Sequence, residues 1–565
     1  MSRFVQRESE PVFTEILTSQ GFARPLAEAL SSRGIRSKEE LEPTWGSMIA
    51  PDTLPGALEA ARVIADAIEA QKKIVIVADY DCDGATACAL AVRALKAFGC
   101  ENVDYAVPSR LTEGYGLSKG IVEDILPLHP DLLITVDNGI ASFEGIAAAR
   151  RHGMQVIVTD HHLAGESLPE DCVIVNPNVP GNPFPSKNLC GVGVIFYVML
   201  TLRSELRKRG LFNKENQPRL TDLVDLVALG TIADVVSLDE NNRILVGYGL
   251  RYIRRGYTQP GIKALFEIAG KPLAQASSRD LAFSVAPRIN AAGRLNIMNV
   301  GIECLLSDNP EYAYAKALEL DSFNQERREL ETKMQYDANV VLNEKDMSGA
   351  YGITLYDESW HQGIVGLVAS RIKEAYNKPT IAFAPAEGDE LRGSGRSVSG
   401  VHLRDTLNEV SLLCPGLILK YGGHSMACGL SIKKGGIDSF RKAFDEVLRK
   451  NHPEGITKDV LVDCPLEPKD ITYELIRQIN SINWGQGFAA PVFFNDFTVL
   501  QQTLLKGGHL KLKLELGGRV FYGVYFRHST PLPKKARLAF RPEFDTRQYK
   551  GNGIELVIED IAENN

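Results

Sequence analysis

The chain has 565 residues, of which 44% are hydrophobic and 24% are charged. This length predicts three or four domains, and the composition excludes a largely disordered protein. No apolar stretch is long enough to cross a membrane, and the first residues lack the apolar segment of a signal peptide, so we expect a soluble, cytoplasmic protein. The nine cysteines include no CxxC pair, which argues against a zinc ribbon and favours reduced thiols.

Net charge and its distribution point in different directions. The formal net charge is −8, which by itself argues against a nucleic-acid-binding protein. Residues 501–550, however, contain eleven Lys or Arg against three Asp or Glu. Lys511 and Lys513 alternate with leucines there, whereas the nearby Phe521, Tyr522 and Tyr525 are expected to be core residues rather than a stacking platform. A cluster of metal-binding carboxylates would also lower the net charge without repelling a phosphate once cations are bound.

The first half of the chain has an alternating pattern. Residues 1–56 are interpreted as an N-terminal helical segment, and residues 57–310 alternate helical stretches with short apolar runs. The runs KIVIVADYD, DLLITVDNG and QVIVTDHH are nearly all apolar, as strands covered on both faces must be. The pattern predicts an α/β domain in which a parallel sheet carries helices on both faces.

Three further segments follow. Residues 311–345 contain no glycine or proline and are interpreted as one long helix that links two domains, with a core helix of the first domain as the alternative. Residues 346–455 alternate again and predict a second α/β domain. Residues 456–565 contain short alternating strands such as HLKLKLEL and IELVIEDI, which predict a small β-barrel, OB-like barrels being one choice among several.

Acidic and imidazole side chains follow three of the predicted strands. Ligands of open parallel sheets bind beyond the carboxyl ends of the strands, so we expect these side chains to converge in one crevice. They are Asp79, Asp81 and Asp83 after the first strand, Asp137 after the second, Asp160, His161 and His162 after the third, and Asp234 in the otherwise apolar ALGTIADVVSL.

This set of side chains predicts a centre for divalent cations. Crowded carboxylates repel one another unless cations bind between them, and oxygen ligands with one or two imidazoles suit Mn²⁺ or Mg²⁺. Two such ions about 4 Å apart promote phosphoryl hydrolysis. Gly84 is expected to let the backbone approach a phosphate, at a helix that begins near Thr86. The alternative for any single Asp is a helix cap, but three clusters at successive strand ends favour the metal centre.

The motifs, taken in order, resemble those of a known superfamily. VADYDCDGATA, TVDNGI, VTDHH and GTIADVV are similar to the four motifs of the DHH phosphoesterases, and GSGRSVSG and YGGHSMACG to their associated DHHA1 domain. With WHQGIVGLVASR and the β-rich tail, the chain resembles the RecJ family of single-strand-specific 5′ exonucleases from about residue 50 onward.

The resemblance implies roles for the individual residues of the centre, with two Mn²⁺ or Mg²⁺ ions. Asp81 and Asp83 each serve one cation, Asp137 bridges both, His161 and Asp234 complete the ligands, and Asp79 either binds a cation or only shapes the loop. Asp160 is expected to orient His161, and His162 to contact the scissile phosphate. Among the substrate contacts, Arg110, Ser394 and Arg396 match positions that hold a 5′-terminal phosphate, and Arg288 is a further strand-binding arginine. His424 is either a substrate contact or a structural residue at a tight turn.

The resemblance further implies stepwise hydrolysis of single-stranded DNA from its 5′ end to nucleoside 5′-monophosphates, in DNA repair and recombination. A monomer is expected, with single-strand-binding protein and a RecQ-type helicase as partners. One alternative is a relative that degrades oligoribonucleotides or cyclic dinucleotides, which the β-rich tail disfavours. Another is a non-catalytic binding module, which the complete ligand set disfavours. Val77 stands where pyrophosphatase-like relatives have a histidine, which disfavours a pyrophosphatase.

Overall fold

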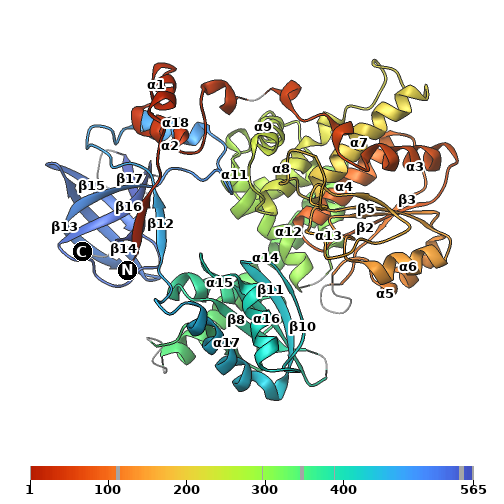
Figure 1. Ribbon diagram of the computed structural model, residues 1–565. Helices are drawn as coiled ribbons and strands as arrows, with labels where there is room; N and C mark the ends of the chain where they lie inside the picture. Colours follow the sequence, from red (N-terminus) through yellow and green to blue (C-terminus); the bar gives the residue numbers. More distant parts are fainter. Residues whose placement is uncertain are drawn as a thin grey trace. The chain divides into compact units, whose positions relative to one another are not determined.

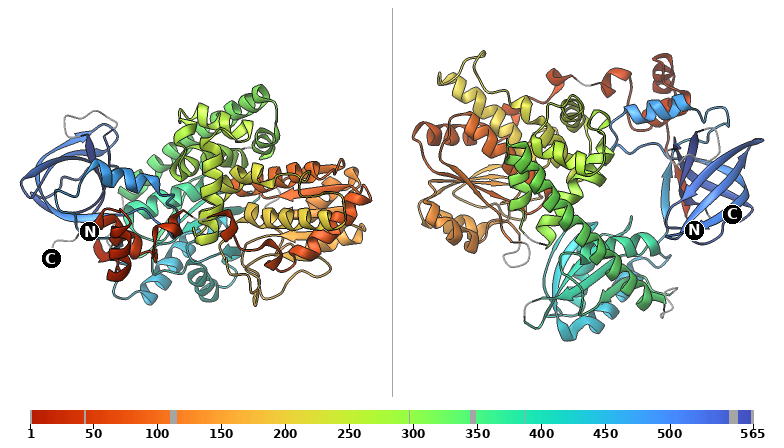
Figure 2. Two further views of the ribbon diagram at one scale, coloured as in Figure 1. Left: turned by 90° about the horizontal axis from the view of Figure 1, so that it is seen from above. Right: turned by 180° about the vertical axis from the view of Figure 1, so that it is seen from behind.

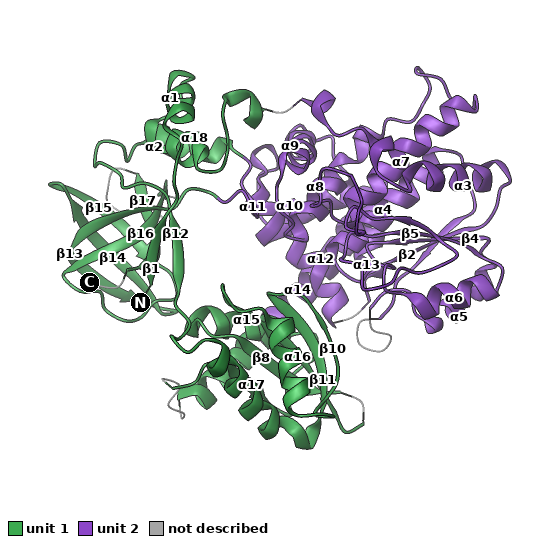
Figure 3. Cartoon of the chain, viewed as in Figure 1, with its two compact units in different colours: residues 1–42, 330–482, 490–565 green, residues 43–329, 483–489 purple. Residues whose placement is uncertain are grey.

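The computed structural model describes residues 2–42, 44–109, 115–295, 297–343, 349–386, 388–545 and 553–562. They form two compact units (Figure 3). Residues 43–329 and 483–489 make up the parallel-sheet unit, and residues 1–42, 330–482 and 490–565 make up the barrel unit. The expected long helix is α14 (Pro310–Asn343), which begins in the parallel-sheet unit and ends in the barrel unit. Within the described ranges, no helix has the length and apolar character needed to span a membrane.

The parallel-sheet unit is built on five strands in the order β3-β2-β4-β5-β6, and every neighbouring pair is parallel. The strands are β2 (Ile74–Ala78), β3 (Val103–Ala106), β4 (Leu132–Val136), β5 (Gln155–Thr159) and β6 (Val173–Val175). All residues of β2 and β4 are buried, which explains their unbroken apolar runs. The three strands predicted from the sequence are therefore adjacent, and their carboxyl ends share one edge.

Helices cover both faces of this sheet, as predicted (Figure 1). Helices α5 (Lys119–Ile125) and α6 (Phe143–Arg151) contribute to one apolar core with Val75, Leu133 and Val156. Helices α4 (Cys82–Ala97) and α7 (Gly191–Lys208) pack against the strands from the other side. The unit also contains α3 (Ala57–Glu69), α8 (Val224–Ala233), α9 (Glu240–Arg254), α10 (Pro260–Ile268), α11 (Ser278–Asp280), α12 (Ala286–Leu295) and α13 (Asn299–Leu306).

The barrel unit contains a second five-stranded sheet in the order β10-β11-β9-β8-β7. Strands β7 (Ile353–Tyr356) and β8 (Thr380–Pro385) are parallel, and β9 (Glu390–Arg396), β10 (Ile418–Gly423) and β11 (Ala427–Lys433) join them in antiparallel pairs. Helices α15 (Val365–Tyr376), α16 (Leu403–Leu413) and α17 (Ile437–Asn451) complete this second α/β region. Phe383, Phe440 and Phe444 are fully buried in its core.

The tail of the chain forms a closed barrel in the order β13-β14-β15-β17-β16 (Figures 1 and 2). Its strands are β13 (Phe493–Leu505), β14 (His509–Leu516), β15 (Arg519–Tyr525), β16 (Lys535–Phe544) and β17 (Ile554–Ile561). Leu510, Leu512 and Leu514 are buried, whereas the lysines between them are on the other face. Phe521 and Tyr525 are buried core residues, as expected, whereas Tyr522 is only partly buried.

The N-terminal segment differs from the predicted helical segment of residues 1–56. Helices α1 (Pro11–Ser19) and α2 (Arg24–Ser31) are present, but they follow a strand, β1 (Arg3–Gln6), that pairs in parallel with β12 (Asp459–Val462). The Arg33 guanidinium donates to both carboxylate oxygens of Asp463, at 2.6 and 3.0 Å, with both side chains buried. Residues 2–42 thus pack with the C-terminal part of the chain, including α18 (Tyr473–Ser481), and the segment divides near residue 43.

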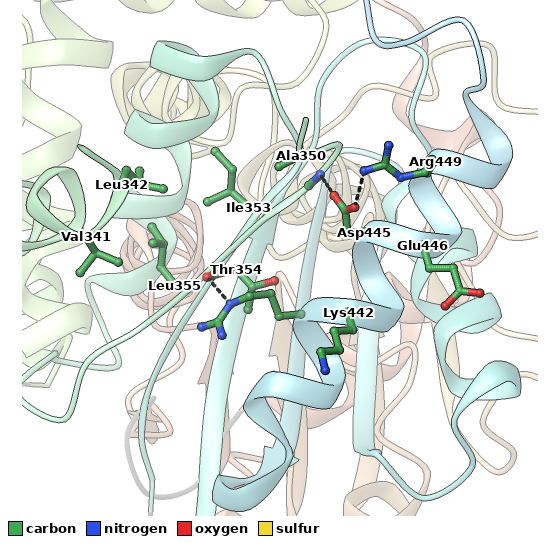
Figure 4. Close-up of a pocket in the computed structure, with 12 residues that line it drawn as sticks. Val341, Leu342, Ala350, Ile353, Thr354, Leu355, Lys442, Asp445, Glu446 and Arg449 are labelled. Carbon is green, nitrogen blue, oxygen red and sulfur yellow. Dashed lines mark hydrogen bonds and ion pairs between the residues drawn. The ribbon is translucent and has the colours of Figure 1, made fainter. Parts of the chain in front are cut away.

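A pocket of about 440 Å³ lies in the barrel unit between the end of α14, β7 and α17 (Figure 4). Asp445 at its rim accepts hydrogen bonds from the backbone of Tyr351 and Gly352 and pairs with Arg449 at 3.0 Å. Asp445 thus holds α17 to the residues that directly precede β7. Among the described residues, none of the predicted site residues lines it.

Candidate metal centre

The predicted ligands converge at the carboxyl ends of β2, β4 and β5. In the Asp79, Asp81 and Asp137 group, and likewise in the Asp83, His161 and Asp234 group, the ligand atoms lie within 4.8 Å of one another. A third such group joins Asp137 to His161 and His162. His161 Nε2 is 3.0 Å from Asp137 Oδ1 and 3.5 Å from Asp234 Oδ2. Asp137 and His161 therefore connect the two sets of carboxylates.

Asp81 also caps a helix. Its Oδ1 accepts hydrogen bonds from the backbone N–H groups of Asp83, at 2.9 Å, and Gly84, at 3.0 Å, so α4 begins at Cys82 and not near Thr86 as we expected. The cap satisfies amides that the first helical turn leaves unpaired. Because a carboxylate has two oxygens with two lone pairs each, a capping Asp can still bind a cation.

Asp83 lies at the N-terminus of a second helix, α7. Its two oxygens accept from the backbone N–H groups of Gly191, at 2.6 Å, and Val192, at 2.9 Å. Burial and the charge of Asp81 nevertheless raise the pKa of Asp83 to about 7, although these hydrogen bonds lower it. The positive end of the α7 dipole therefore stabilises this carboxylate only in part.

Gly84 lies at a close backbone contact. A Cβ at this position would lie 2.4 Å from the backbone carbonyl oxygen of Asp79. The missing side chain therefore allows the start of α4 to pack on the residue that follows β2.

Asp137 has an unusual backbone. Its φ is +63°, a left-handed conformation that costs a non-glycine residue energy and is concentrated at functional sites. Its N–H donates to the Thr159 carbonyl at 3.0 Å, and a Cβ on Gly191 would lie 2.3 Å from the Asp137 Cβ. Burial and the charges of Asp83 and Asp81 raise its pKa well above the usual range. The fold thus holds a carboxylate where its charge is unfavourable without a cation.

Asp234 directly follows α8 and is the last of the predicted ligands along the chain. Burial and the charges of Asp83 and Asp81 raise its pKa well above the usual value. The next residue, Val235, is exposed and also has a positive φ, +62°, which is rare for a β-branched residue. Two of the predicted ligands are therefore at or beside strained backbone.

Asp160 contacts the ring of His162, although we expected it to orient His161. Its Oδ1 is 2.8 Å from Nδ1 of His162 and accepts the backbone N–H of His161 at 2.7 Å. Asp160 and His162 are two residues apart directly after a strand, where alternate side chains point to the same side. Burial lowers the pKa of His162, but the hydrogen bond and charge of Asp160 outweigh it and raise the pKa to about 9. Asp160 therefore favours a protonated His162.

Two polar contacts were not anticipated. The Tyr115 hydroxyl donates to the Asp137 carbonyl at 3.0 Å and is also 3.0 Å from Nδ1 of His162. Asn290 on α12 accepts the backbone N–H of Cys82 at 2.8 Å and so holds the loop after β2. Tyr115 lies in PSRLTEGYG and Asn290 in PRINAAGR, the two segments whose arginines are predicted substrate contacts. Tyr115 lies five residues after Arg110, and Asn290 lies two residues after Arg288.

The predicted substrate residues are distributed over both units. Arg110 lies outside the described residues. Arg288 is in the parallel-sheet unit, where its Nε is 2.9 Å from Asp321 Oδ1. On β9 of the barrel unit, Arg396 donates to the Ser394 hydroxyl at 3.0 Å, and His424 is exposed at the turn between β10 and β11.

Comparisons with known proteins agree with this architecture. The chain matches the DHH family N-terminal domain over residues 73–231, the DHHA1 domain over 349–450 and the RecJ OB domain over 462–560. It is 43% identical over 546 residues to the single-stranded-DNA-specific exonuclease RecJ of Escherichia coli, covering 94% of each chain. It is 42% identical over 582 residues to that of Haemophilus influenzae, covering 99% of each.

Solved structures give the same result. The crystal structure of RecJ in complex with Mn²⁺ from Thermus thermophilus is similar with a TM-score of 0.84 and 28% identity, over 100% of this chain and 80% of that chain. The corresponding complex with Mg²⁺ is similar with a TM-score of 0.78 and 27% identity, over 100% and 79%. On its sequence, its domains and its fold, the chain belongs to the RecJ family.

Proposed function

We propose that this protein is a metal-dependent exonuclease that hydrolyses single-stranded DNA from the 5′ end and releases nucleoside 5′-monophosphates. The convergence of Asp137 with the ligands after β2 and β5 carries this proposal. The identity of 43% to an exonuclease specific for single-stranded DNA supports it.

The residues of the centre fit two divalent cations. The donors are carboxylates with one or two imidazoles, which suit Mn²⁺ or Mg²⁺. The pKa values of Asp83, Asp137 and Asp234 are raised by burial and by mutual repulsion, and cations relieve the repulsion. We assign Asp79, Asp81 and Asp137 to one cation and Asp83, His161 and Asp234 to the other, with Asp137 shared between them. When bound, such a pair activates water and stabilises the leaving oxygen.

His162 is assigned to the scissile phosphate. Asp160 fixes its ring and raises its pKa to about 9, so at neutral pH the imidazolium is positively charged and has N–H groups to donate to a phosphate oxygen. Tyr115 contacts the same ring and the Asp137 backbone, and it thereby ties the position of His162 to that of the shared carboxylate.

The 5′ polarity is assigned to a pocket for the terminal phosphate. Ser394 and Arg396 offer a hydroxyl and a guanidinium that already contact each other, which is a suitable pair for a phosphate. A Cβ on Gly366, in the first turn of α15, would lie 2.8 Å from the Ser394 hydroxyl oxygen, so a larger residue there would displace this hydroxyl. Arg110 is proposed to hold the same terminal phosphate. Arg288 and His424 are proposed as further contacts with the substrate.

We further propose that residues 57–310, 346–455 and 456–565 are the catalytic, DHHA1 and DNA-binding domains, joined by the helix of residues 311–345 and preceded by residues 1–56. A monomer acting in the cytoplasm in DNA repair and recombination is expected. Single-strand-binding protein and a RecQ-type helicase stay predicted partners, which copurification from the native cell would test.

The test uses oligonucleotides labelled at one end and incubated with the full chain and Mn²⁺. A 5′-labelled single strand should release labelled mononucleotide at once, whereas a 3′-labelled strand should shorten progressively. Blunt duplex and an RNA strand of the same sequence are the controls. Equal digestion of duplex and single strand would contradict the specificity, and immediate release of a 3′ label would contradict the polarity. Digestion of only di- to tetranucleotides would favour the oligoribonuclease alternative.

A further inference from the structure

The helix that carries Arg288 has a bulge with a local cause. It runs from α11 through a π-helical turn, Leu281–Val285, into α12. Pro287 has no N–H to donate to the carbonyl of Phe283, and in the wider turn the N–H of Ala286 donates to the carbonyl of Leu281 instead. π-helical turns of this kind are frequent at functional sites.

The bulge leaves one phenylalanine in solvent. Leu281 and Val285, on either side of it, are both fully buried, whereas Phe283 between them is 77% exposed. Among the large apolar side chains of the described residues, none is more exposed. The helix is thus anchored by its inner face and presents an aromatic ring on its outer face.

The charged group of Arg288 lies against the same turn. Its Nη1 donates to the carbonyl of Ser284, the residue after Phe283, and its Nε faces Asp321 at 2.9 Å. The guanidinium is therefore folded back along the helix to the turn that carries Phe283. A cation and an aromatic ring on adjacent turns of one helix match the two parts of a nucleotide, a phosphate and a flat base.

The helix is also tied to the metal centre. Asn290 accepts the N–H of Cys82, next to Asp81, at 2.8 Å. Seven residues separate Asn290 from Phe283, which corresponds to roughly 10 Å along a helix axis. A base at Phe283 would thus belong to a nucleotide close to the one being cleaved.

We propose that Phe283 is a base-stacking residue for single-stranded DNA and that its ring packs on the base of a nucleotide whose phosphate contacts Arg288. This inference rests on the proposed function and adds a determinant of specificity to it. In a duplex each base is covered by its neighbours and paired along its edge, so the ring has no free face to stack on. An unpaired base offers that face whatever its identity, so the contact selects single strands without selecting a sequence.

The first test compares Phe283→Ala with Phe283→Trp in the full chain, by fluorescence anisotropy with a single-stranded oligonucleotide in EDTA. Loss of one stacked base predicts binding about 5- to 100-fold weaker for the alanine variant and near wild-type binding for the tryptophan variant. In Mn²⁺, KM should rise while kcat stays within about twofold, because the ring does not touch the reacting atoms. Tyr257→Ala is the control, since Tyr257 is 69% exposed in the same unit on a different element.

The second test identifies the stacked base. Oligonucleotides with one abasic nucleotide at each of the first several positions are bound to the wild type and to Phe283→Ala. At one position the abasic change should weaken wild-type binding and leave the alanine variant unaffected, because the two changes remove the same contact. Unchanged binding and KM in Phe283→Ala, or an equal loss at every abasic position, would overturn the proposal. Failure of the proposed function looks different, because the wild type itself would then leave single strands undigested.

Discussion

The two sheets of the molecule use their strands in different ways. In the parallel-sheet unit, β2, β4 and β5 are fully or almost fully buried and contribute chemistry only where they end. In the barrel unit, the antiparallel strand β9 carries Ser394 and Arg396, and His424 lies in the turn that precedes its neighbour β11. A parallel sheet gathers all its carboxyl ends at one edge and so concentrates charge, whereas antiparallel strands expose side chains along one face. We therefore expect catalysis to depend on the parallel-sheet unit and recognition of the DNA end to depend mainly on the barrel unit.

Replacing Asp137 tests the first half of this comparison and should have the largest effect. Asparagine tolerates the left-handed backbone at this position but lacks the charge that two cations share. We expect Asp137→Asn to lower kcat at least about 1,000-fold, with binding of the strand largely retained. Initial rates in Mn²⁺ and anisotropy in EDTA measure the two quantities. A variant with normal kcat would remove Asp137 from the centre.

Replacing Arg396 tests the second half. The loss of one charge-assisted contact with a phosphate predicts a rise in KM of about 10- to 100-fold for a strand with a 5′-phosphate. A strand with a 5′-hydroxyl serves as the matched control, and its KM should change little. If both strands lose equally, Arg396 contributes to folding or to binding of the strand in general, and the contrast between the two units fails.

Replacing Tyr115 tests whether its hydroxyl positions catalytic groups in the parallel-sheet unit. Tyr115→Phe keeps the ring and removes the hydroxyl that contacts Asp137 and His162. One neutral hydrogen bond predicts a fall in kcat of about 2- to 10-fold with an unchanged KM. Tyr115→Leu also removes the ring contact with His162 and should lose more. A change in KM alone would place the hydroxyl on the substrate instead.

Cation binding should be visible without any DNA and gives the smallest expected effect. Mn²⁺ at about 100 times its Kd stabilises a folded state by about 2.7 kcal/mol, so the melting temperature should rise by a few degrees over that in EDTA. The Asp137→Asn variant should show a much smaller rise. In EDTA, its melting temperature should not fall, because the substitution removes one of several repelling carboxylates. An equal Mn²⁺ effect in both proteins would place the cations elsewhere.

The predictable parts of the fold have strong local signals. The strands β2, β4 and β5 are apolar runs that stop at charged residues, and α14 has neither glycine nor an internal proline to interrupt it. The alternation of HLKLKLEL similarly identifies β14. In contrast, β1 has four residues, RFVQ, and pairs with a strand 456 residues further along, so nothing near it in the chain indicates a strand.

For the metal centre, the residue types that follow each strand are read directly from the chain, and they predict the chemistry because a parallel sheet brings successive motifs to a common edge. How each group is held depends on contacts that form only in the folded protein. Asp83 accepts hydrogen bonds from amides at the start of α7, more than a hundred residues later. Asp160 contacts the ring of His162, and the Tyr115 hydroxyl contacts both His162 and Asp137. Such contacts depend on the close packing of segments that are distant in the chain, which periodicity and motif spacing do not encode.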